Sequence, residues 1–291
     1  MRVLILGVAG QDGSYLAEQL LEDGDEVWGL IHRRTRDEAP DAVRLVEGDL
    51  ADEYSLEDAF HLVQPDEIYN LAAVTAPGGA WGVPQQPHLA NVTGTGVVRV
   101  LEMMRRCVPE AHLVHASSSA IYDPHRYGLY GISKKFAHEA VRGYRTGYGM
   151  HVSNAVLFSH TSARQDGRFL APTITRTLKR IMRGSNEKLR IANFSDRRDW
   201  GYAPDFMRAL PLIARSQVAR DYDVATGITH STWDFVNHAL KVSGLGDDVL
   251  ETYTLPQAPR ETVAHLGPIE TLGWMPQTSF TRMIELMMEG S

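Results

Sequence analysis

The sequence predicts an α/β fold in which helices cover both faces of a doubly wound parallel sheet. Three observations support this prediction. Short aliphatic runs alternate with amphipathic stretches in the first half, several of these runs are almost entirely apolar, and the amphipathic stretches contain no proline. Strands covered on both faces are nearly continuous apolar runs, and helices between them link parallel neighbours. A chain of 291 residues, 43% of them hydrophobic, suffices for one large domain or two smaller ones.

The expected elements follow one another in alternation. Aliphatic and β-branched residues indicate the strands, and apolar residues at helical spacing indicate the helices. Strands are predicted at Arg2–Leu6, Glu26–Ile31, Val43–Val46, Glu67–Leu71, His112–Ala116 and His151–Phe158, and helices at Ser14–Glu22, Ser55–Val63, Val92–Arg106 and Ser133–Tyr148. The segment Ala76–Pro87 is rich in Gly and Pro, which predicts a loop over the carboxyl edge of the sheet, where ligands of such sheets bind.

The charge and cysteine content exclude several classes of partner and site. A net charge of −7 and a pI near 5.9 argue against nucleic acid or an anionic membrane as a general partner. The single cysteine, Cys107, makes no intrachain disulfide, and no Cys/His cluster suggests a metal site. No apolar run reaches the roughly 18 residues of a membrane span, and the chain opens directly into a strand pattern. We therefore expect a soluble, cytoplasmic protein.

A glycine motif lies between the first strand and the first helix. Gly7, Gly10 and Gly13 form a GxxGxxG run, in which glycine permits a tight turn and lets backbone amides approach a pyrophosphate. The same spacing also occurs in ordinary turns, but its place directly after a strand favours a dinucleotide site. The motif thus predicts a Rossmann-like domain.

The predicted domain organisation is split along the chain. Residues 1–158 and about 190–228 are expected to form the NAD(P)-binding Rossmann domain, including a late strand at Tyr222–Ala225 that returns to the sheet. After Phe158 the alternation weakens. About 159–189 and 229–291 are expected to form a smaller mixed α/β portion that binds the substrate.

Two charged features predict the choice of cofactor. An acidic residue at the end of the second strand would bind an NAD ribose, but here Arg33 and Arg34 follow His32. Two guanidinium groups suit a 2′-phosphate and favour NADP over NAD; the alternative is a solvated basic turn. Asp49, after the third strand, lies where it could hold an adenine amino group, or it could cap a helix.

A serine, a tyrosine and a lysine predict an oxidoreductase site. Tyr130 and Lys134 are four residues apart, hence on one helix face, and the run Ser117–Ser119 follows the fifth strand. An ammonium beside a phenol lowers the phenol pKa, so that Tyr130 could remove a proton from an alcohol while a serine orients that alcohol. The alternative is an exposed pair on a helix surface.

These residues resemble the extended short-chain dehydrogenase/reductase family, and within it the GDP-mannose 4,6-dehydratases most closely. The resemblance covers nearly the whole chain. Its strongest pieces are GQDGSYLAE at 10–18, DEIYNL at 66–71, NVTGTG at 91–96, FSH at 158–160 and RDWGYA at 198–203, of which the first and last are specific to that subgroup.

The resemblance implies roles for individual residues. The catalytic residues would be Ser118, Tyr130 and Lys134, the last two also binding the cofactor. Further cofactor-binding residues would be Gly7, Gly10, Gln11, Asp12, Gly13, Arg33, Arg34, Asp49, Leu50, Leu71, Ala72 and Ala73. Substrate-binding residues would be Thr75, Ser159, His160, Arg164, Arg198 and Arg260. It also implies a homodimer, or a higher oligomer, formed by the helices at Val92–Arg106 and Ser133–Tyr148.

Two departures from the family pattern bear on the reaction. Dehydratases of this group carry a glutamate base two residues after the hydroxyl residue, where this chain has Ala120. Only 12 positions separate Ser118 from Tyr130, fewer than the family has, so a loop over the sugar is shortened. Asp123 and His125 lie in that loop and could replace the base, although a surface role is the simpler interpretation.

The expected function is therefore oxidation of a nucleotide-sugar hydroxyl, at C4, by a nicotinamide cofactor with Tyr130 as base. Dehydration would then give a 4-keto-6-deoxy sugar, whereas hydride return to the opposite face would give a 4-epimer. Ala120 weakens the first route. The residues also leave open a simple dehydrogenase or reductase, and a non-catalytic dinucleotide-binding regulator.

Overall fold

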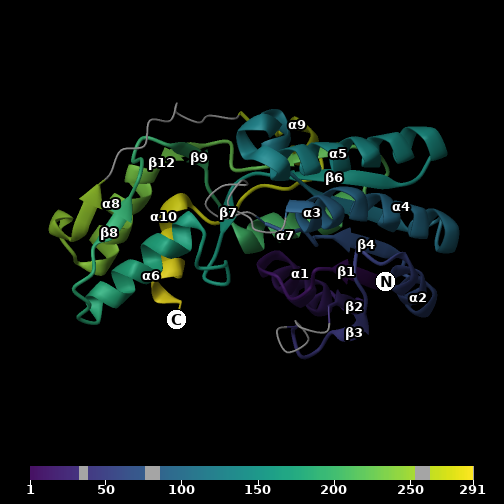
Figure 1. Ribbon diagram of the computed structural model, residues 1–291, viewed down its shortest axis with the longest axis horizontal. Helices are drawn as coiled ribbons and strands as arrows, with labels where there is room; N and C mark the ends of the chain where they lie inside the picture. The colour runs from purple at the N-terminus through teal and green to yellow at the C-terminus, as the bar shows by residue number, and fades with distance from the viewer. Residues whose placement is uncertain (33–38, 76–85, 253–262, 291) are drawn as a thin grey trace.

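A seven-stranded sheet forms the centre of the molecule (Figure 1). The computed structural model describes residues 1–32, 39–75, 86–252 and 263–290. The strand order is β11-β6-β5-β4-β1-β2-β3, and every neighbouring pair is parallel. The strands are β1 (Arg2–Leu6), β2 (Glu26–Ile31), β3 (Arg44–Glu47), β4 (Glu67–Asn70), β5 (His112–Ser118), β6 (Val152–Leu157) and β11 (Asp221–Val224). The predicted fold class and the return of a late strand to the sheet are confirmed.

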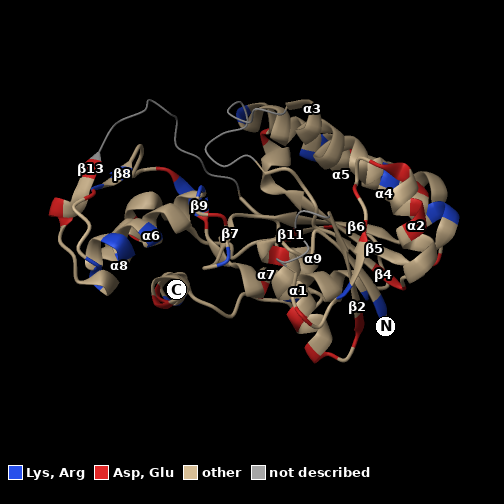
Figure 2. Ribbon diagram, turned by 60° about the horizontal axis from the view of Figure 1, so that its bottom comes forward, with Lys and Arg blue, Asp and Glu red and all other residues tan. Residues whose placement is uncertain are grey.

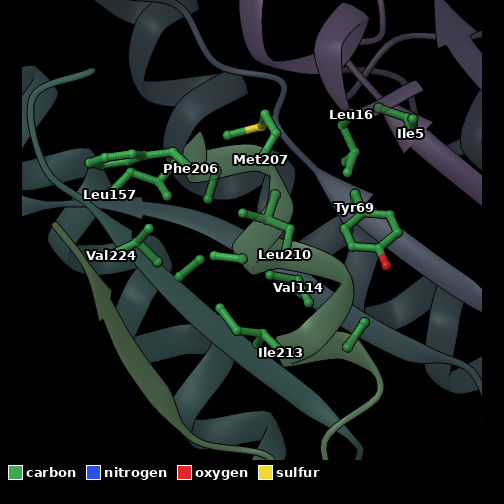
Figure 3. Packing of buried hydrophobic residues seen from close by; sticks show 14 of the residues in the cluster. Ile5, Leu16, Tyr69, Val114, Leu157, Phe206, Met207, Leu210, Ile213 and Val224 are labelled. Carbon is green, nitrogen blue, oxygen red and sulfur yellow. The ribbon is translucent and has the colours of Figure 1, made fainter. Parts of the chain in front are cut away.

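Helices cover both faces of this sheet. One face carries α1 (Gln11–Glu22) and α7 (Ala203–Ala214), and the other carries α2 (Glu53–Val63), α4 (Gly96–Cys107) and α5 (Gly128–Tyr148). Strand β1 is apolar from Val3 to Leu6 because its alternate residues enter two different cores: Leu4 packs with the α2, α4 and α5 face, whereas Ile5 packs with α1 and α7. Figure 3 shows the second of these cores, with Phe206, Met207, Leu210 and Ile213 of α7 lying over the strands.

The helix predicted over Val92–Arg106 is wrong in its details. A short helix α3 (Gln86–Leu89) is followed by a π-helical stretch, Ala90–Thr95, and only then by α4. At the start of α4, Gly96 packs closely on the loop after β3: a Cβ on it would lie 3.1 Å from Leu50 Cβ. Gln86 and Pro87 of the predicted loop belong to α3, and residues 76–85 lie outside the described part.

The smaller portion has its own hydrophobic core. Ile174, Phe235 and Ile284 pack in it together with Ile191 and Trp200, which the sequence groups with the sheet domain. We therefore propose that residues 190–200 belong to the smaller portion. Its elements are β7 (His160–Thr161), α6 (Leu170–Met182), β8 (Leu189–Ile191), β9 (Arg197–Asp199), β10 (Gly201–Tyr202), β12 (Thr229–Ser231), α8 (Thr232–Ser243), β13 (Leu250–Thr252) and α10 (Phe280–Glu289). The short helix α9 (Gly267–Glu270) instead packs against β11, and its Ile269 lies in the core of the sheet domain.

The smaller portion lies beside the carboxyl edge of the sheet, and the chain reaches it directly from β6 through β7 (Figure 1). Within the described ranges, no helix combines the length and apolarity needed to cross a membrane.

Candidate active site

The glycine motif forms a turn that only glycine can occupy. Gly7 has a φ of +89°, and a Cβ on it would lie 2.9 Å from the backbone nitrogen of Ala72. A Cβ on Gly13 would lie 2.3 Å from the Gly7 carbonyl oxygen, because helix α1 begins directly against the end of β1. This contact holds the amino end of α1, with its free N–H groups, at the carboxyl edge of the sheet. The turn therefore fits the pyrophosphate of a dinucleotide.

A cavity of about 310 Å³ lies over the start of α1. Its walls come from the glycine loop, from the segment before β3 and from the smaller portion. It is lined by Ala9, Gly10, Gln11, Ser14, Glu18, Ala39, Pro40 and Arg164. In a Rossmann-like sheet, the space between the first loop and the end of the second strand accommodates the adenosine end of the cofactor.

Arg164 is held against helix α1. Its guanidinium donates to Ser14 Oγ at 3.0 Å, pairs with Glu18 at 2.9 Å and lies 4.0 Å from the centre of the Tyr15 ring. The sequence predicts Arg164 as a substrate ligand, and the structure places it in the wall of this cavity. All three residues that contact Arg164 belong to the GQDGSYLAE segment at 10–18. This segment therefore also holds in place the part of the chain that follows β6.

His160 and Asp12 form an ion pair across the same junction. His160 Nε2 lies 3.0 Å from Asp12 Oδ2, and His160 Nδ1 lies 2.7 Å from the Phe158 carbonyl oxygen. Burial lowers the pKa of His160, but the Asp12 carboxylate outweighs burial and the net pKa is raised. Burial likewise opposes ionisation of Asp12, but the charge of His160 prevails and the pKa of Asp12 is lowered. The pair therefore joins residues 148 positions apart as ions.

This pair predicts a pH-dependent contribution to stability. Because the pKa of His160 is raised in the folded chain, the charged imidazole stabilises that chain fully below about pH 6.5, the pKa of histidine in the unfolded chain. This stabilisation is lost as the pH rises through the pKa of His160 in the folded chain. The lowered pKa of Asp12 stabilises it above about pH 4 and is lost on acidification. Asp12→Asn should therefore cost roughly 1–3 kcal/mol of unfolding free energy at about pH 5.5, and clearly less at about pH 9.

Urea unfolding followed by tryptophan fluorescence measures this difference. Ser14→Ala removes a hydrogen bond from the same junction without removing a titratable group, so its cost should be the same at both pH values. A cost of Asp12→Asn that does not change with pH would contradict the prediction.

Tyr130, Lys134 and Ser118 come together at the carboxyl end of β5. Tyr130 lies in the first turn of α5 and forms a hydrogen bond with the Ser118 hydroxyl. Lys134 is only 4% exposed, and its ammonium donates to the Ala116 carbonyl oxygen at 2.7 Å. Helix α5 starts earlier than the sequence predicts because Gly128 has a φ of +58°, and because Gly131 packs where a Cβ would lie 2.3 Å from the Pro124 carbonyl oxygen. The tight entry into α5 thus brings Tyr130 to Ser118.

The pKa of Tyr130 differs from the one that the sequence predicts for a phenol beside Lys134. Burial raises the pKa of Tyr130, and the hydrogen bond from Ser118 opposes that rise only in part. The expected lowering of the phenol pKa by Lys134 is therefore wrong for the chain alone. Burial also lowers the pKa of Lys134 to about 8, with the Asp12 carboxylate opposing it. The charge of Asp12 acts on both Tyr130 and Lys134, so the tyrosine and the lysine lie near the glycine loop.

The other predicted cofactor residues that the structure describes follow strands β3 and β4. Asp49 Oδ1 accepts from the Ala51 N–H at 2.8 Å, whereas the residue that caps helix α2 is Asp52. Leu50 is buried in the core beneath. Leu71 donates its N–H to the Leu6 carbonyl, and Ala72 lies against Gly7, with Ala73 next along the chain. Arg33 and Arg34 lie outside the described residues.

The predicted substrate residues occupy the two sides of the junction. Thr75 is exposed after β4, and the Ser159 carbonyl accepts from the Gly201 N–H at 2.9 Å. Arg198 pairs with Asp196 at 2.9 Å and lies over Trp200. Figure 2 shows basic residues on β9, where the smaller portion meets the larger one. Arg260 lies outside the described residues.

The shortened loop contains no buried acid at position 120. Ala120 is buried in a 3₁₀ turn, and Asp123 and His125 are exposed. Tyr122 instead donates to Asp223 Oδ1 at 2.5 Å, and Asp223 Oδ2 accepts from the His265 N–H at 2.8 Å. The loop is thereby tied to β11 and to the segment before α9. The sequence alone gives no sign of this link, since Tyr122 and Asp223 are 101 positions apart.

Comparison with known proteins identifies the family. Residues 4–287 match the family model of GDP-mannose 4,6 dehydratase. GDP-mannose 4,6 dehydratase 1 of Arabidopsis thaliana is 33% identical over 320 residues, covering 98% of this chain and 88% of the relative. The Vibrio cholerae GDP-mannose 4,6-dehydratase is 29% identical and covers 98% of this chain and 91% of its own.

Solved structures agree on the architecture. UDP-glucose 4-epimerase of Thermus thermophilus, in complex with NAD, superposes with a TM-score of 0.84 at 25% identity, over 100% of this chain and 98% of that one. A dTDP-glucose 4,6-dehydratase of Bacillus anthracis, also in complex with NAD, superposes with a TM-score of 0.85 over 99% of this chain and 96% of that one. Its sequence is 16% identical, so this likeness shows the fold alone. The chain belongs to the GDP-mannose 4,6 dehydratase family and is an NAD(P)-dependent enzyme of the sugar-nucleotide dehydratase and epimerase class.

Proposed function

We propose that this enzyme oxidises the C4 hydroxyl of a nucleotide sugar, with Tyr130 as the base. The observation that carries the proposal is the bond between Tyr130 and Ser118 at the carboxyl end of β5, beside the glycine loop that fits a dinucleotide. A bound nicotinamide would accept the hydride from the sugar carbon. Ser118 would orient the sugar hydroxyl, and Tyr130 would take its proton.

The proposed cofactor is NADP, with NAD as the alternative. Gly7 and Gly13 permit the close turn that sets the amino end of α1 against the end of β1, an arrangement that suits a pyrophosphate. Arg164 adds a guanidinium to the cavity wall between Gly10 and Pro40, and Arg33 follows β2 in the sequence. Guanidinium groups bind phosphate with paired hydrogen bonds, which suits a 2′-phosphate. Titration of the protein with both oxidised dinucleotides tests this choice.

The step after oxidation is proposed to be hydride return to C4, giving the 4-epimer. Removal of the C5 proton requires a base, and the buried methyl group of Ala120 supplies none. Asp123 and His125, the substitutes that the sequence offers, are exposed. UDP-glucose 4-epimerase is also among the similar structures. Dehydration, which the family name implies, is the second candidate.

Product analysis distinguishes these reactions. With GDP-mannose or UDP-glucose and catalytic NADP, we expect a product of unchanged mass, since loss of a general base typically slows a reaction by about 10²- to 10⁴-fold. Mass spectrometry and proton NMR in deuterated water would measure loss of water and exchange at C5. Ala120→Glu should restore C5 exchange, whereas the matched Ala120→Gln should not. A dehydrated sugar from the unaltered enzyme would rule out epimerisation as its main reaction.

The oligomer is proposed to be a dimer formed through α4 and α5. Helix α5 exposes three large apolar or aromatic side chains, Ile132, Phe136 and Tyr148, at 40%, 49% and 61%. Exposed apolar groups on one long helix are typical of a helix-to-helix interface. Sedimentation velocity of the protein and of a Phe136→Glu variant would test this arrangement: only the variant should be a monomer.

A further inference from the structure

The turn that carries Ser118 is bound to a distant strand by its last residue. The Ser118 hydroxyl accepts from the Ala120 N–H at 3.2 Å, at the start of the 3₁₀ turn Ser119–Tyr122. Tyr122 donates its hydroxyl proton to Asp223 Oδ1 of β11 at 2.5 Å. Neither Tyr122 nor Asp223 is among the catalytic, cofactor-binding or substrate-binding residues named above. The bond thus ties the Ser118 turn to a strand that supplies no residue to the proposed reaction.

This link crosses one strand of the sheet. Asp223 is the register partner of Val156 on β6, and Val156 is that of Ser117 on β5, so Asp223 lies in the same row as the end of β5, two strands away. The ring of Tyr122 lies beside Phe158, which follows β6, with 6.2 Å between the ring centres. Tyr122 is 51% exposed, whereas Asp223 and Phe158 are buried. A half-exposed aromatic side chain is therefore held by two buried groups.

Asp223 also binds a second segment. Its other carboxylate oxygen, Oδ2, accepts from the His265 N–H at 2.8 Å, in the stretch that leads into α9. Helix α9 packs against β11, and its Ile269 is buried in the core of the sheet domain, so this stretch has an anchor of its own. The bond from His265 fixes the orientation of the carboxylate. Tyr122 is thus bonded to an acceptor that does not turn with it.

The turn after β11 is held from the smaller portion. Asp199 of β9 is buried, and its Oδ1 accepts from the N–H and from the hydroxyl of Thr226, both at 2.8 Å. Its Oδ2 accepts from the Gly227 N–H at 2.7 Å. Asp199 directly follows Arg198, a predicted substrate residue. The carboxyl end of β11 therefore supports two segments of the proposed sugar site, the Ser118 turn and β9.

We propose that Tyr122 and Asp223 are positioning residues for sugar oxidation, which hold the Ser118 turn against the strand end that also supports β9. The proposal rests on the proposed roles of Ser118 and Tyr130 in catalysis. Ser118 has to meet the Tyr130 phenol and the sugar hydroxyl at once, so a displacement of its turn separates the groups that exchange the proton. Tyr122 and Asp223 act on the reaction through Ser118.

The hydroxyl of Tyr122 adjusts a turn that other residues fold. Ala120 and Ile121, within the turn, are buried and keep their packing when that hydroxyl is removed. In the next 3₁₀ turn, Pro124–Tyr127, none of the residues is buried, so this turn adds little support. Loss of the Tyr122 hydroxyl should therefore let the Ser118 turn shift without unfolding it.

The test uses Tyr122→Phe in the full-length enzyme. This substitution removes the bond to Asp223 and keeps a ring beside Phe158. At saturating nucleotide sugar, the single-turnover rate of nicotinamide reduction should fall about 10- to 100-fold, because a misplacement of about 1 Å costs up to about 100-fold in rate. The half-saturating concentration of the sugar and the affinity for NADP should each change by less than about twofold, because β9 and the glycine loop keep their contacts.

The matched control is Tyr222→Phe. Tyr222 precedes Asp223 on β11, is buried, and donates its hydroxyl proton to the Val218 carbonyl oxygen at 2.9 Å, before the strand begins. The control therefore removes a tyrosine hydroxyl bond from the same strand, at the amino edge of the sheet. Thermal unfolding should show a loss of stability in this variant, and the oxidation rate should be unchanged.

Two more variants show whether the effect passes through Asp223 and Ser118. Asp223→Asn leaves one oxygen to accept from both Tyr122 and His265, so its rate should fall by a similar factor, and adding Tyr122→Phe should cause no further loss. In the Ser118→Ala background, Tyr122→Phe should leave the residual rate unchanged, because the residue on which it acts has lost its hydroxyl.

Three results would overturn the positioning role. They are an unaltered rate in Tyr122→Phe, an equal loss of rate in Tyr222→Phe, and a loss by the full factor in the Ser118→Ala background. Hydrogen–deuterium exchange of the cofactor-free protein gives a reading that needs no activity: amides of residues 119–127 should exchange faster in Tyr122→Phe than in Tyr222→Phe, and equal exchange would contradict the proposal. If Ser118→Ala itself oxidises the sugar at the unaltered rate, the proposed function fails, while the exchange result still decides whether Tyr122 holds the turn.

Discussion

Tyr130→Phe is expected to lower kcat/KM for nucleotide-sugar oxidation by about 10²- to 10⁴-fold while the cofactor remains bound. The substitution removes only the hydroxyl that bonds Ser118, and the ring keeps its half-buried place in the first turn of α5. The loss should therefore appear in the chemical step and not in assembly of the site. Reduction of the nicotinamide, followed by absorbance after mixing with the nucleotide sugar, measures that step directly.

The matched control for this prediction is Tyr54→Phe. Tyr54 lies on α2 and is 80% exposed, so the same loss of a hydroxyl there should leave the rate unchanged. Dinucleotide affinity, measured by protein fluorescence, should be similar in both variants and the unaltered enzyme. If Tyr130→Phe retained most of the oxidation rate, Tyr130 would not be the base, and the serine-tyrosine-lysine interpretation of this site would be wrong.

Local chemistry explains why much of the site can be predicted from sequence. A strand buried on both faces must be apolar throughout, so the sequence predicts Arg2–Leu6 and Glu26–Ile31 with the bounds that the structure has. A turn in which a side chain would strike the backbone requires glycine, and Gly7 and Gly13 meet that requirement. The spacing of Tyr130 and Lys134 is likewise a property of one helix.

Contacts between distant segments leave no such pattern. Asp12 and His160 pair across 148 positions, and each residue alone is an ordinary polar side chain beside a glycine or a strand. The contacts of Arg164 with Ser14, Tyr15 and Glu18 of helix α1 likewise leave no pattern in the sequence.

Burial is equally hard to infer from sequence. The raised pKa of Tyr130 arises from how deeply α5 packs against β5, a quantity that depends on the complete fold.

Gly13→Ala is expected to weaken dinucleotide binding by at least about 100-fold. The added Cβ would lie 2.3 Å from the Gly7 carbonyl oxygen and 2.6 Å from Val8 Cα. Both neighbours are backbone atoms of the turn itself, so relief requires the start of α1 to move away from the end of β1. That movement displaces the amides that we propose face the pyrophosphate. A buried backbone clash of this kind is among the few substitutions that cost more than about 4 kcal/mol. Isothermal titration with NADP measures the loss of affinity, and thermal unfolding measures the cost in stability.

The matched control is Gly143→Ala on helix α5. Nothing lies within 4 Å of the Cβ that this substitution adds, and alanine is favoured over glycine in a helix by about 1 kcal/mol, so the variant should be slightly more stable and bind NADP normally. The two variants add the same methyl group, and they differ in whether backbone already fills its place. Full affinity in Gly13→Ala would show that α1 can withdraw without disturbing the cofactor site, and the close contact between α1 and β1 would then be a packing feature with no part in binding.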